Sequence, residues 1–176
     1  MKERFSMLDD KLVELLNDQV NKEFYSAYLY LSMANYYNEE GLSGFGNWFT
    51  IQAQEERDHA MLFLEYLQNN GAHVELKTVE APKKKFKEFK DPLDESLKHE
   101  RYVTASIHNI YAAASKVKDF RTMQFLDWFV KEQGEEEKTA EDLIKKLELF
   151  GQDGKGLYML DSELASRTYS APTLTL

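Results

Sequence analysis

Four glutamates occur in this sequence where the apolar pattern of a helix requires a core residue: Glu23, Glu56, Glu100 and Glu136. Around each of them apolar residues recur at alternating steps of four and three, the pattern typical of helices that pack along a common seam. No Lys or Arg occupies these seam positions. Ionised carboxylates inside a bundle are costly unless they are protonated or neutralised by cations. The pattern therefore predicts a buried site whose negative charge two divalent cations would neutralise.

The potential ligands also repeat along the chain. In each half a glutamate is followed 33 residues later by a pair of ligand-type residues at i and i+3: Glu23 by Glu56 and His59, and Glu100 by Gln133 and Glu136. Residues at i and i+3 lie on one helix face, so each pair can point at one ion. A single glutamate in a helix seam is more often hydrogen-bonded or partly exposed than a ligand. Four of them at matched depth, with a repeated spacing, favour a metal site.

The ligand types narrow the choice of metal. Oxygen-rich ligation with one imidazole, from His59, suits iron or manganese better than calcium or magnesium, and tetrahedral zinc uses fewer oxygens. The chain contains no cysteine, which excludes Cys-ligated zinc, iron–sulfur clusters and a thiol nucleophile. Tyr30, one heptad beyond Glu23, would place a redox-capable phenol near the site, although by itself it also fits ordinary core packing.

Four amphipathic helices must position these residues. Their seams run through residues 12–37, 45–66, 93–114 and 122–150. A cap at Ser6, with Asp9 three residues on, is expected to begin the first helix, while Gly71 and Gly151 are expected to end the second and the fourth. We therefore predict an all-α four-helix bundle, with a short fifth helix at 157–167 after a glycine-rich turn.

The lengths of the connections predict the topology. The links at 39–42 and 117–119 are short, so each pair of helices should form an antiparallel hairpin. About 20 residues without helical periodicity separate Gly71 from Pro92. At about 3.3 Å per residue they can cover ~65 Å, more than the ~42 Å length of a 28-residue helix. The second and third helices should therefore run parallel, and the Lys-rich run at 83–90 is expected to be solvated rather than an anion or nucleic-acid site.

Several other residues are expected to serve the fold. We expect the remaining histidines, His73, His99 and His108, to be surface or capping residues, and Met33, Met61 and Met123 to be core residues. Gly134, inside the fourth helix, should cost about 1 kcal/mol relative to alanine. Residues 1–168 are expected to form one domain and 169–176 a flexible tail.

Length, composition and charge limit the class of protein. The chain has 176 residues, with 43% hydrophobic and 30% charged residues and only three prolines, as expected for one folded helical domain. Its net charge of -9 argues against nucleic-acid binding. The longest uncharged run, 24–38, is 15 residues and polar in part, too short for a membrane span, and the N-terminus lacks a signal-peptide stretch. A cytoplasmic protein is expected.

Four stretches resemble the non-haem bacterial ferritins, over nearly the whole chain. They are NKEFYSAYLYLSM (21–33), QEERDHA (54–60), KHE (98–100) and FLDWFVKEQGEEE (125–137). The resemblance implies that the predicted bundle is a ferritin-like four-helix bundle and that it holds a ferroxidase centre, which binds two iron ions per subunit. By match to the family's motif, the first ion would be held by Glu23, Glu56 and His59 and the second by Glu100 and Glu136, with Glu56 bridging and Gln133 and Tyr30 close by.

The resemblance also implies a third iron site and an assembly. The third site, beside the pair, would use Glu55, Glu132, Glu135 and Glu136, although the first three of these residues would equally fit a solvated acidic face. Twenty-four identical subunits would form a hollow cage that stores ferric oxide mineral, with the fifth helix at a symmetry axis. Bacterioferritin places a haem-ligating Met where this chain has Arg57, so no haem is expected.

We therefore interpret the sequence as an iron-storage protein that oxidises Fe(II) with O2 or H2O2. One alternative is a soluble di-iron oxidase or oxygenase, which would need an apolar pocket beside the metals. Another is a non-catalytic scaffold related to the mini-ferritins, for which a 12-mer or dimer would be expected instead of a 24-mer.

Overall fold

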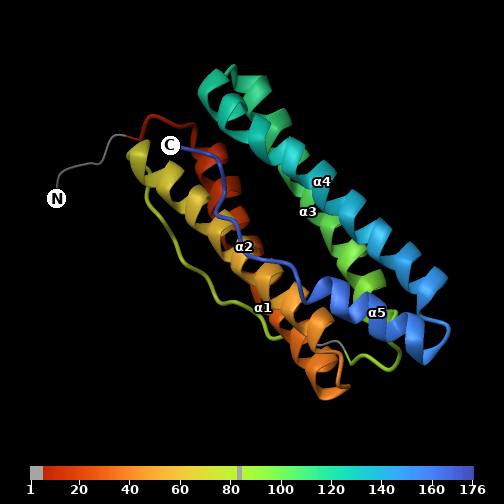
Figure 1. The fold of residues 1–176 in the computed structure, drawn as a ribbon. Helices are drawn as coiled ribbons and strands as arrows, with labels where there is room; N and C mark the ends of the chain where they lie inside the picture. The colour runs from red at the N-terminus through yellow and green to blue at the C-terminus, as the bar shows by residue number, and fades with distance from the viewer. Residues whose placement is uncertain (1–5, 83–84) are drawn as a thin grey trace.

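The computed structural model describes residues 6–82 and 85–176 of the chain. Their helices are α1 (Asp10–Glu39), α2 (Ser43–Asn69), α3 (Asp91–Val117), α4 (Phe120–Phe150) and α5 (Gly154–Leu164). Figure 1 shows α1 to α4 side by side as a bundle, with α5 at one end, where it packs against α2 and α4. The prediction of an all-α bundle with a short fifth helix is confirmed.

The connections follow the predicted topology. Three residues join α1 to α2 and two join α3 to α4, which makes each pair an antiparallel hairpin. The described part of the connection from 70 to 90 contains no helix and runs along the outside of α1 and α2 in Figure 1. It returns the chain to the far end of the bundle, so α2 and α3 run parallel. Of the Lys-rich run, Lys83 and Lys84 lie outside the described residues, while Lys85 and Lys87 are exposed.

Aspartates begin three of the helices, and this corrects two of our boundaries. Asp9 is the N-cap of α1 and accepts a hydrogen bond from the Lys11 amide, so the predicted cap at Ser6 is wrong. Asp153 caps α5 and accepts from the Gly156 amide at 2.8 Å. The predicted glycine-rich turn is therefore the first turn of α5, because satisfying a free amide at the N-cap offsets the low helix propensity of glycine.

The interior consists of two apolar clusters with a polar layer between them. Leu12, Leu16 and Phe63 belong to the first cluster and Tyr37 and Phe49 to the second. Along every helix of the bundle the predicted glutamate lies between the residues that enter these clusters. The apolar packing on both sides thus holds the polar layer away from water.

Two methionines depart from the expected core. Met61 is 39% exposed, because it lies two residues from His59 and Phe63 and so on the opposite face of α2. Met123 is half-buried, whereas Met33 is fully buried as predicted. Helical spacing alone therefore did not distinguish the seam from the flank of a helix.

The residues after α5 lie along the bundle between α2 and α4 (Figure 1). Trp128 donates a hydrogen bond to the Thr173 hydroxyl at 3.2 Å, and Leu174 packs against the first apolar cluster. We call residues 165–176 the C-terminal segment. The division into a domain at 1–168 and a flexible tail at 169–176 stays a prediction.

Within the described ranges, no helix combines the length and the apolar character that crossing a membrane requires.

Candidate metal centre

Each of the four long helices contributes one glutamate to the polar layer between the apolar clusters. Glu23 from α1, Glu56 from α2 and Glu100 from α3 are at most 2% exposed, and Glu136 from α4 is 9% exposed. We call these four residues the carboxylate layer. The helix seams place all four side chains between the two apolar clusters.

One half of the layer brings together three side chains that could hold a metal ion. Glu23, Glu56 and His59 each offer a ligand atom, and these three atoms lie within 4.8 Å of one another. The second oxygen of Glu23, Oε2, is buried and has no hydrogen-bond partner in the described part of the chain. A buried carboxylate oxygen without a partner is costly. The donor set and the unpartnered oxygen both fit a cation between α1 and α2.

Three glutamines, one on each of α1, α2 and α4, donate hydrogen bonds to the layer. Gln19 donates to Glu23 at 2.7 Å and Gln133 donates to Glu100 at 3.0 Å. Gln52 donates from one amide nitrogen to both Glu56, at 3.1 Å, and Glu136, at 2.9 Å. The carboxylates are thus oriented before any ion binds.

The roles of Gln19 and Gln52 were not predicted from the sequence. Both lie on a predicted seam, and each precedes a glutamate of the layer by four residues. That spacing puts an amide and a carboxylate on one helix face, and it was the available signal. Gln133 could be predicted because it stands at the position corresponding to Glu56 in the repeat.

The orientation of Gln19 depends on a cation outside the layer. Lys22 donates to the Ser106 hydroxyl at 2.6 Å, and Ser106 donates to the amide oxygen of Gln19 at 2.6 Å. The amide oxygen therefore faces a donor, and the amide nitrogen faces Glu23. The α1–α3 contact thus helps to position a candidate ligand that it does not touch.

Burial controls the protonation of the layer. Loss of hydration, together with repulsion from the neighbouring Glu56 carboxylate, raises the pKa of Glu23 and of Glu100 to about 8. Burial also raises the pKa values of Glu56 and Glu136. Repulsion from Glu136 adds to the effect at Glu56, and repulsion from Glu100 adds to the effect at Glu136. The metal-free layer therefore retains protons near neutral pH, and a bound cation must displace them.

Tyr30 lies directly beside the layer. Its side chain is fully buried, its hydroxyl donates to Glu100, and its ring stacks on Phe49 with centroids 5.8 Å apart. Burial, followed by the Glu100 charge, raises the pKa of Tyr30 well above its usual value. The phenol therefore stays protonated and acts as a donor to Glu100.

The prediction that His99 is a surface or capping residue is wrong. It is 7% exposed rather than a surface or capping residue, and its Nε2 lies 2.7 Å from the Ser26 hydroxyl. Burial lowers its pKa to about 4, so the imidazole is neutral at physiological pH. The reason is its place on α3, one residue before Glu100, on the face that packs against α1. His73 and His108 are exposed as expected.

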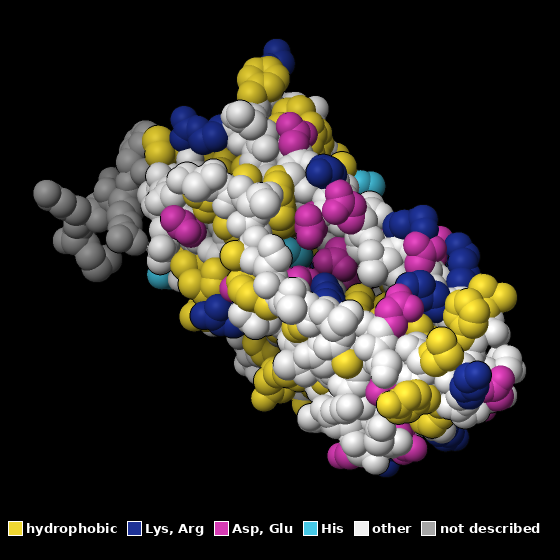
Figure 2. Space-filling view, viewed as in Figure 1, with side chains coloured by type: hydrophobic (Ala, Val, Ile, Leu, Met, Phe, Trp, Pro, Cys, Tyr) yellow, Lys and Arg dark blue, Asp and Glu magenta, His cyan; other side chains and the backbone are white. Residues whose placement is uncertain are grey.

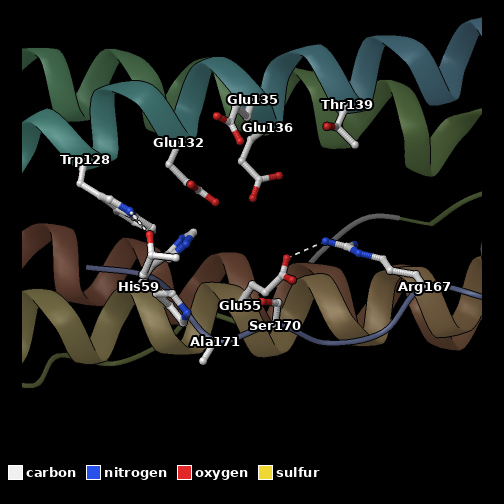
Figure 3. A pocket seen from close by; sticks show the side chains of 12 residues that line it. Glu55, His59, Trp128, Glu132, Glu135, Glu136, Thr139, Arg167, Ser170 and Ala171 are labelled. Carbon is white, nitrogen blue, oxygen red and sulfur yellow. Dashed lines mark hydrogen bonds and ion pairs between the residues drawn. The ribbon is translucent and has the colours of Figure 1, made fainter. Parts of the chain in front are cut away.

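The residues expected at a third iron site surround an opening beside the layer. A cavity of about 290 Å³ lies between α2, α4 and the C-terminal segment, and Glu135 is among the residues that line it. Figure 3 shows Glu132 and Glu136 extending from α4 toward the side of Glu55. Burial raises the pKa of Glu55 and of Glu132. Figure 2 shows acidic side chains gathered around a hollow in this face of the molecule. Cations can therefore approach the layer from here.

Two of these acidic residues already have partners. Glu55 Oε2 lies 2.6 Å from the Arg167 guanidinium, and the exposed Glu135 forms an ion pair with Lys131, one turn away on α4.

Arg57, where a haem-ligating Met would stand in bacterioferritin, is exposed at the α1–α2 face and lines a different cavity, together with Tyr28 and other residues.

Comparison with known proteins agrees with this architecture. A family model described as a ferritin-like domain matches residues 13–150. The bacterial non-heme ferritin of Staphylococcus aureus strain USA300 is 40% identical over 163 residues, covering 93% of this chain and 98% of that protein. The corresponding ferritin of Staphylococcus haemolyticus has the same identity and coverage.

Two solved structures of an archaeal ferritin share both the fold and a substantial part of the sequence of this chain. An engineered closed form of the Archaeoglobus fulgidus ferritin is 44% identical with a TM-score of 0.90, over 93% of this chain and 99% of that chain. The open-pore ferritin of the same archaeon is 44% identical with a TM-score of 0.89, over 92% of this chain and 98% of that chain.

Proposed function

The chain belongs to the ferritin family, and from that premise we propose that it oxidises ferrous iron at the carboxylate layer and stores the ferric product. The observation that carries the proposal is the buried group of Glu23, Glu56 and His59, in which one carboxylate oxygen lacks a partner. Iron is here a substrate and a cargo. The resemblance noted in the sequence and the family membership agree.

We assign the ligands as the motif implies. Glu23, Glu56 and His59 bind the first ferrous ion, Glu100 and Glu136 bind the second, and Glu56 bridges them. Two divalent ions neutralise four carboxylates, which accounts for the burial of so many acidic groups. Two ferrous ions held together can supply both electrons that H2O2, or O2 reduced to peroxide, takes up.

The remaining polar side chains support these ligands. Gln133 and Tyr30 donate to Glu100, so they hold it in one orientation while ions enter and leave. The raised pKa values of Glu23 and Glu100 mean that the layer releases protons when ions bind. A third iron ion, held by Glu55, Glu132, Glu135 and Glu136, would bind more weakly, since Glu55 is already paired with Arg167.

We further propose that 24 subunits form a closed cage in the cytoplasm, with mineral inside. Exposed apolar side chains support an assembly: Tyr28, Leu31 and Met61 on α1 and α2, and Tyr158 and Met159 on α5. Such surfaces usually mark contacts between proteins. A particle mass of 24 chains, with iron loading far above two ions per chain, is expected. A 12-mer or dimer would contradict this, and loading that stops near two would indicate a di-iron oxidase.

The ferroxidase assignment is tested at Glu56. Ferrous iron added to the metal-free protein under air should give a rapid rise in ferric absorbance. Glu56→Ala removes the bridging ligand, so it should reduce the initial rate by at least the roughly 10- to 100-fold that loss of an outer-shell partner costs. Glu65→Ala, on the exposed face of the same helix, is the control and should behave as the wild type. An unchanged rate in Glu56→Ala would refute the assignment.

A further inference from the structure

Arg167 lies where the C-terminal segment crosses α2. Its guanidinium sits 4.3 Å from the centre of the Trp48 ring and donates to the Trp48 carbonyl at 3.1 Å. The Asn47 side chain donates to the backbone carbonyl of Arg167 at 3.1 Å. Backbone and side chain are thus both held, and the guanidinium points toward the candidate metal centre (Figure 3).

Arg167 determines which way the Gln52 amide faces. Both terminal nitrogens of the guanidinium donate to the amide oxygen of Gln52, each at 3.0 Å. A guanidinium can only donate, so the oxygen must face Arg167 and the amide nitrogen must face away from it. That nitrogen donates to Glu56 and Glu136. Arg167 therefore orients two carboxylates of the layer without touching them.

The same guanidinium also forms an ion pair with Glu55. The 2.6 Å contact joins side chains that are 23% and 18% exposed, so water screens it less than a surface pair. Glu55 lines the cavity that Glu132, Glu135 and Glu136 also line. A cation entering that cavity would have to draw Glu55 away from Arg167 before it could use this carboxylate.

We propose that Arg167 is a positioning residue of the metal centre. It directs Gln52 toward Glu56 and Glu136, and it holds Glu55 back from the third metal position. The centre therefore binds two ions tightly and a third weakly. This inference rests on the proposed function, because it requires that the carboxylate layer bind metal.

Titration of the metal-free, full-length protein with Co²⁺ tests the proposal. The measurements are the number of Co²⁺ equivalents bound per chain and the visible absorption of the bound ion. Arg167→Met keeps the length of the side chain and removes its donors. We expect the first two equivalents to bind roughly tenfold more weakly, as on loss of an outer-shell partner. We expect the third to bind about tenfold more tightly, because Glu55 is released.

Two further variants separate the two effects. Gln52→Met leaves Arg167 paired with Glu55, so it should weaken the first two equivalents and leave the third unchanged. Adding Glu55→Gln to Arg167→Met should remove the gain at the third. Lys146→Met is the control: Lys146 pairs with Glu163 and ties α4 to α5 away from the layer, and its loss should change none of these values.

The outcomes distinguish this inference from the function beneath it. If the wild type binds two Co²⁺ ions and Arg167→Met matches it at all three equivalents, the inference is wrong and the proposed function stands. If Lys146→Met reproduces the changes, they reflect looser docking of α5, and the inference is again wrong. If the wild type binds no Co²⁺, the proposed function itself fails. Should Arg167→Met not fold, Gln52→Met still tests the first half. Glu55→Gln alone tests the second half: it should leave the third equivalent unchanged, because Arg167 already holds Glu55 back, and a weaker third equivalent would overturn that half.

Discussion

At the scale of single residues, burying the carboxylate layer costs free energy, and the same burial favours the binding of a cation. Burial raises the pKa of its glutamates, so the metal-free protein holds them protonated and hydrogen-bonded to Gln19, Gln52 and Gln133. Among the buried side-chain nitrogen and oxygen atoms of the described residues, only Oε2 of Glu23 has no hydrogen-bond partner. The layer is therefore stable enough to fold and still favours a cation.

This protonation predicts a pH dependence of stability. The pKa of Glu100 is about 8 in the folded protein and near 4.5 when unfolded, so the folded state binds more protons between these values. Its stabilising contribution is complete below pH 4.5 and is lost as the pH rises through 8. The free energy of unfolding of the metal-free protein should fall by up to about 1.4 kcal/mol per pH unit for each such group.

Denaturant unfolding at pH 5, 7 and 9 measures this dependence. Glu100→Gln, which cannot ionise, should flatten the profile, while Glu65→Gln on the exposed face of α2 should leave it unchanged. A metal-free protein whose stability rises from pH 5 to pH 9 would contradict the protonated layer. Bound divalent ions should reverse the trend, because they stabilise the ionised form.

At the scale of the elements, glycines in two helices show how packing decides what a helix tolerates. Gly134 in α4 is exposed, and a Cβ added there would meet no atom within 4 Å. Gly44 in α2 lies against α5, where a Cβ would collide with the carbonyl oxygen of Asp161. The close approach of two backbones explains Gly44, whereas no contact within the chain explains Gly134.

We expect Gly134→Ala to raise the free energy of unfolding by about 1 kcal/mol, since alanine has the higher helix propensity and the space is open. Gly44→Ala, its counterpart, should lower the free energy and loosen α5. Thermal unfolding of the metal-free variants measures both. If Gly134→Ala is destabilising while the particle mass is unchanged, the predicted helix-propensity gain is wrong.

At the scale of the whole molecule, the exposed apolar side chains favour contact with another protein surface. Tyr28 and Leu31 on α1 are 54% and 43% exposed, and together with Phe24 and Val79 they line an apolar cavity of about 580 Å³ between α1, α2 and the long connection. A surface of this kind is usually covered by another protein surface. In a cage of identical subunits the partner would be a second copy.

Leu31→Glu should therefore prevent assembly, because it would bury an unpaired charge in a contact between subunits. We expect smaller species in place of the proposed 24-subunit particle in native mass measurement, with the helical content retained. Leu31→Met, which keeps the apolar character, should assemble normally. Full assembly of Leu31→Glu would show that this face lies outside the subunit contacts.

The sequence by itself determined the bundle and the composition of its buried layer. Helical periodicity and ligand spacing at i+3 are local properties, so they can be read along the chain, and the short links and the long connection then allow few topologies. The four glutamates, His59 and Gln133 were identified in this way. Family membership, which the resemblance implied, is confirmed by comparison over nearly the whole chain.

Only the tertiary structure decided which groups outside the motif act on the layer. Arg167 reaches Gln52 across 115 residues of sequence, and Lys22 acts on Gln19 through Ser106, on another helix. The burial of His99 likewise depends on α1 packing against its face of α3. Such contacts are set by where separate elements meet in space, and the periodicity of a single helix carries no information about the position of its neighbours.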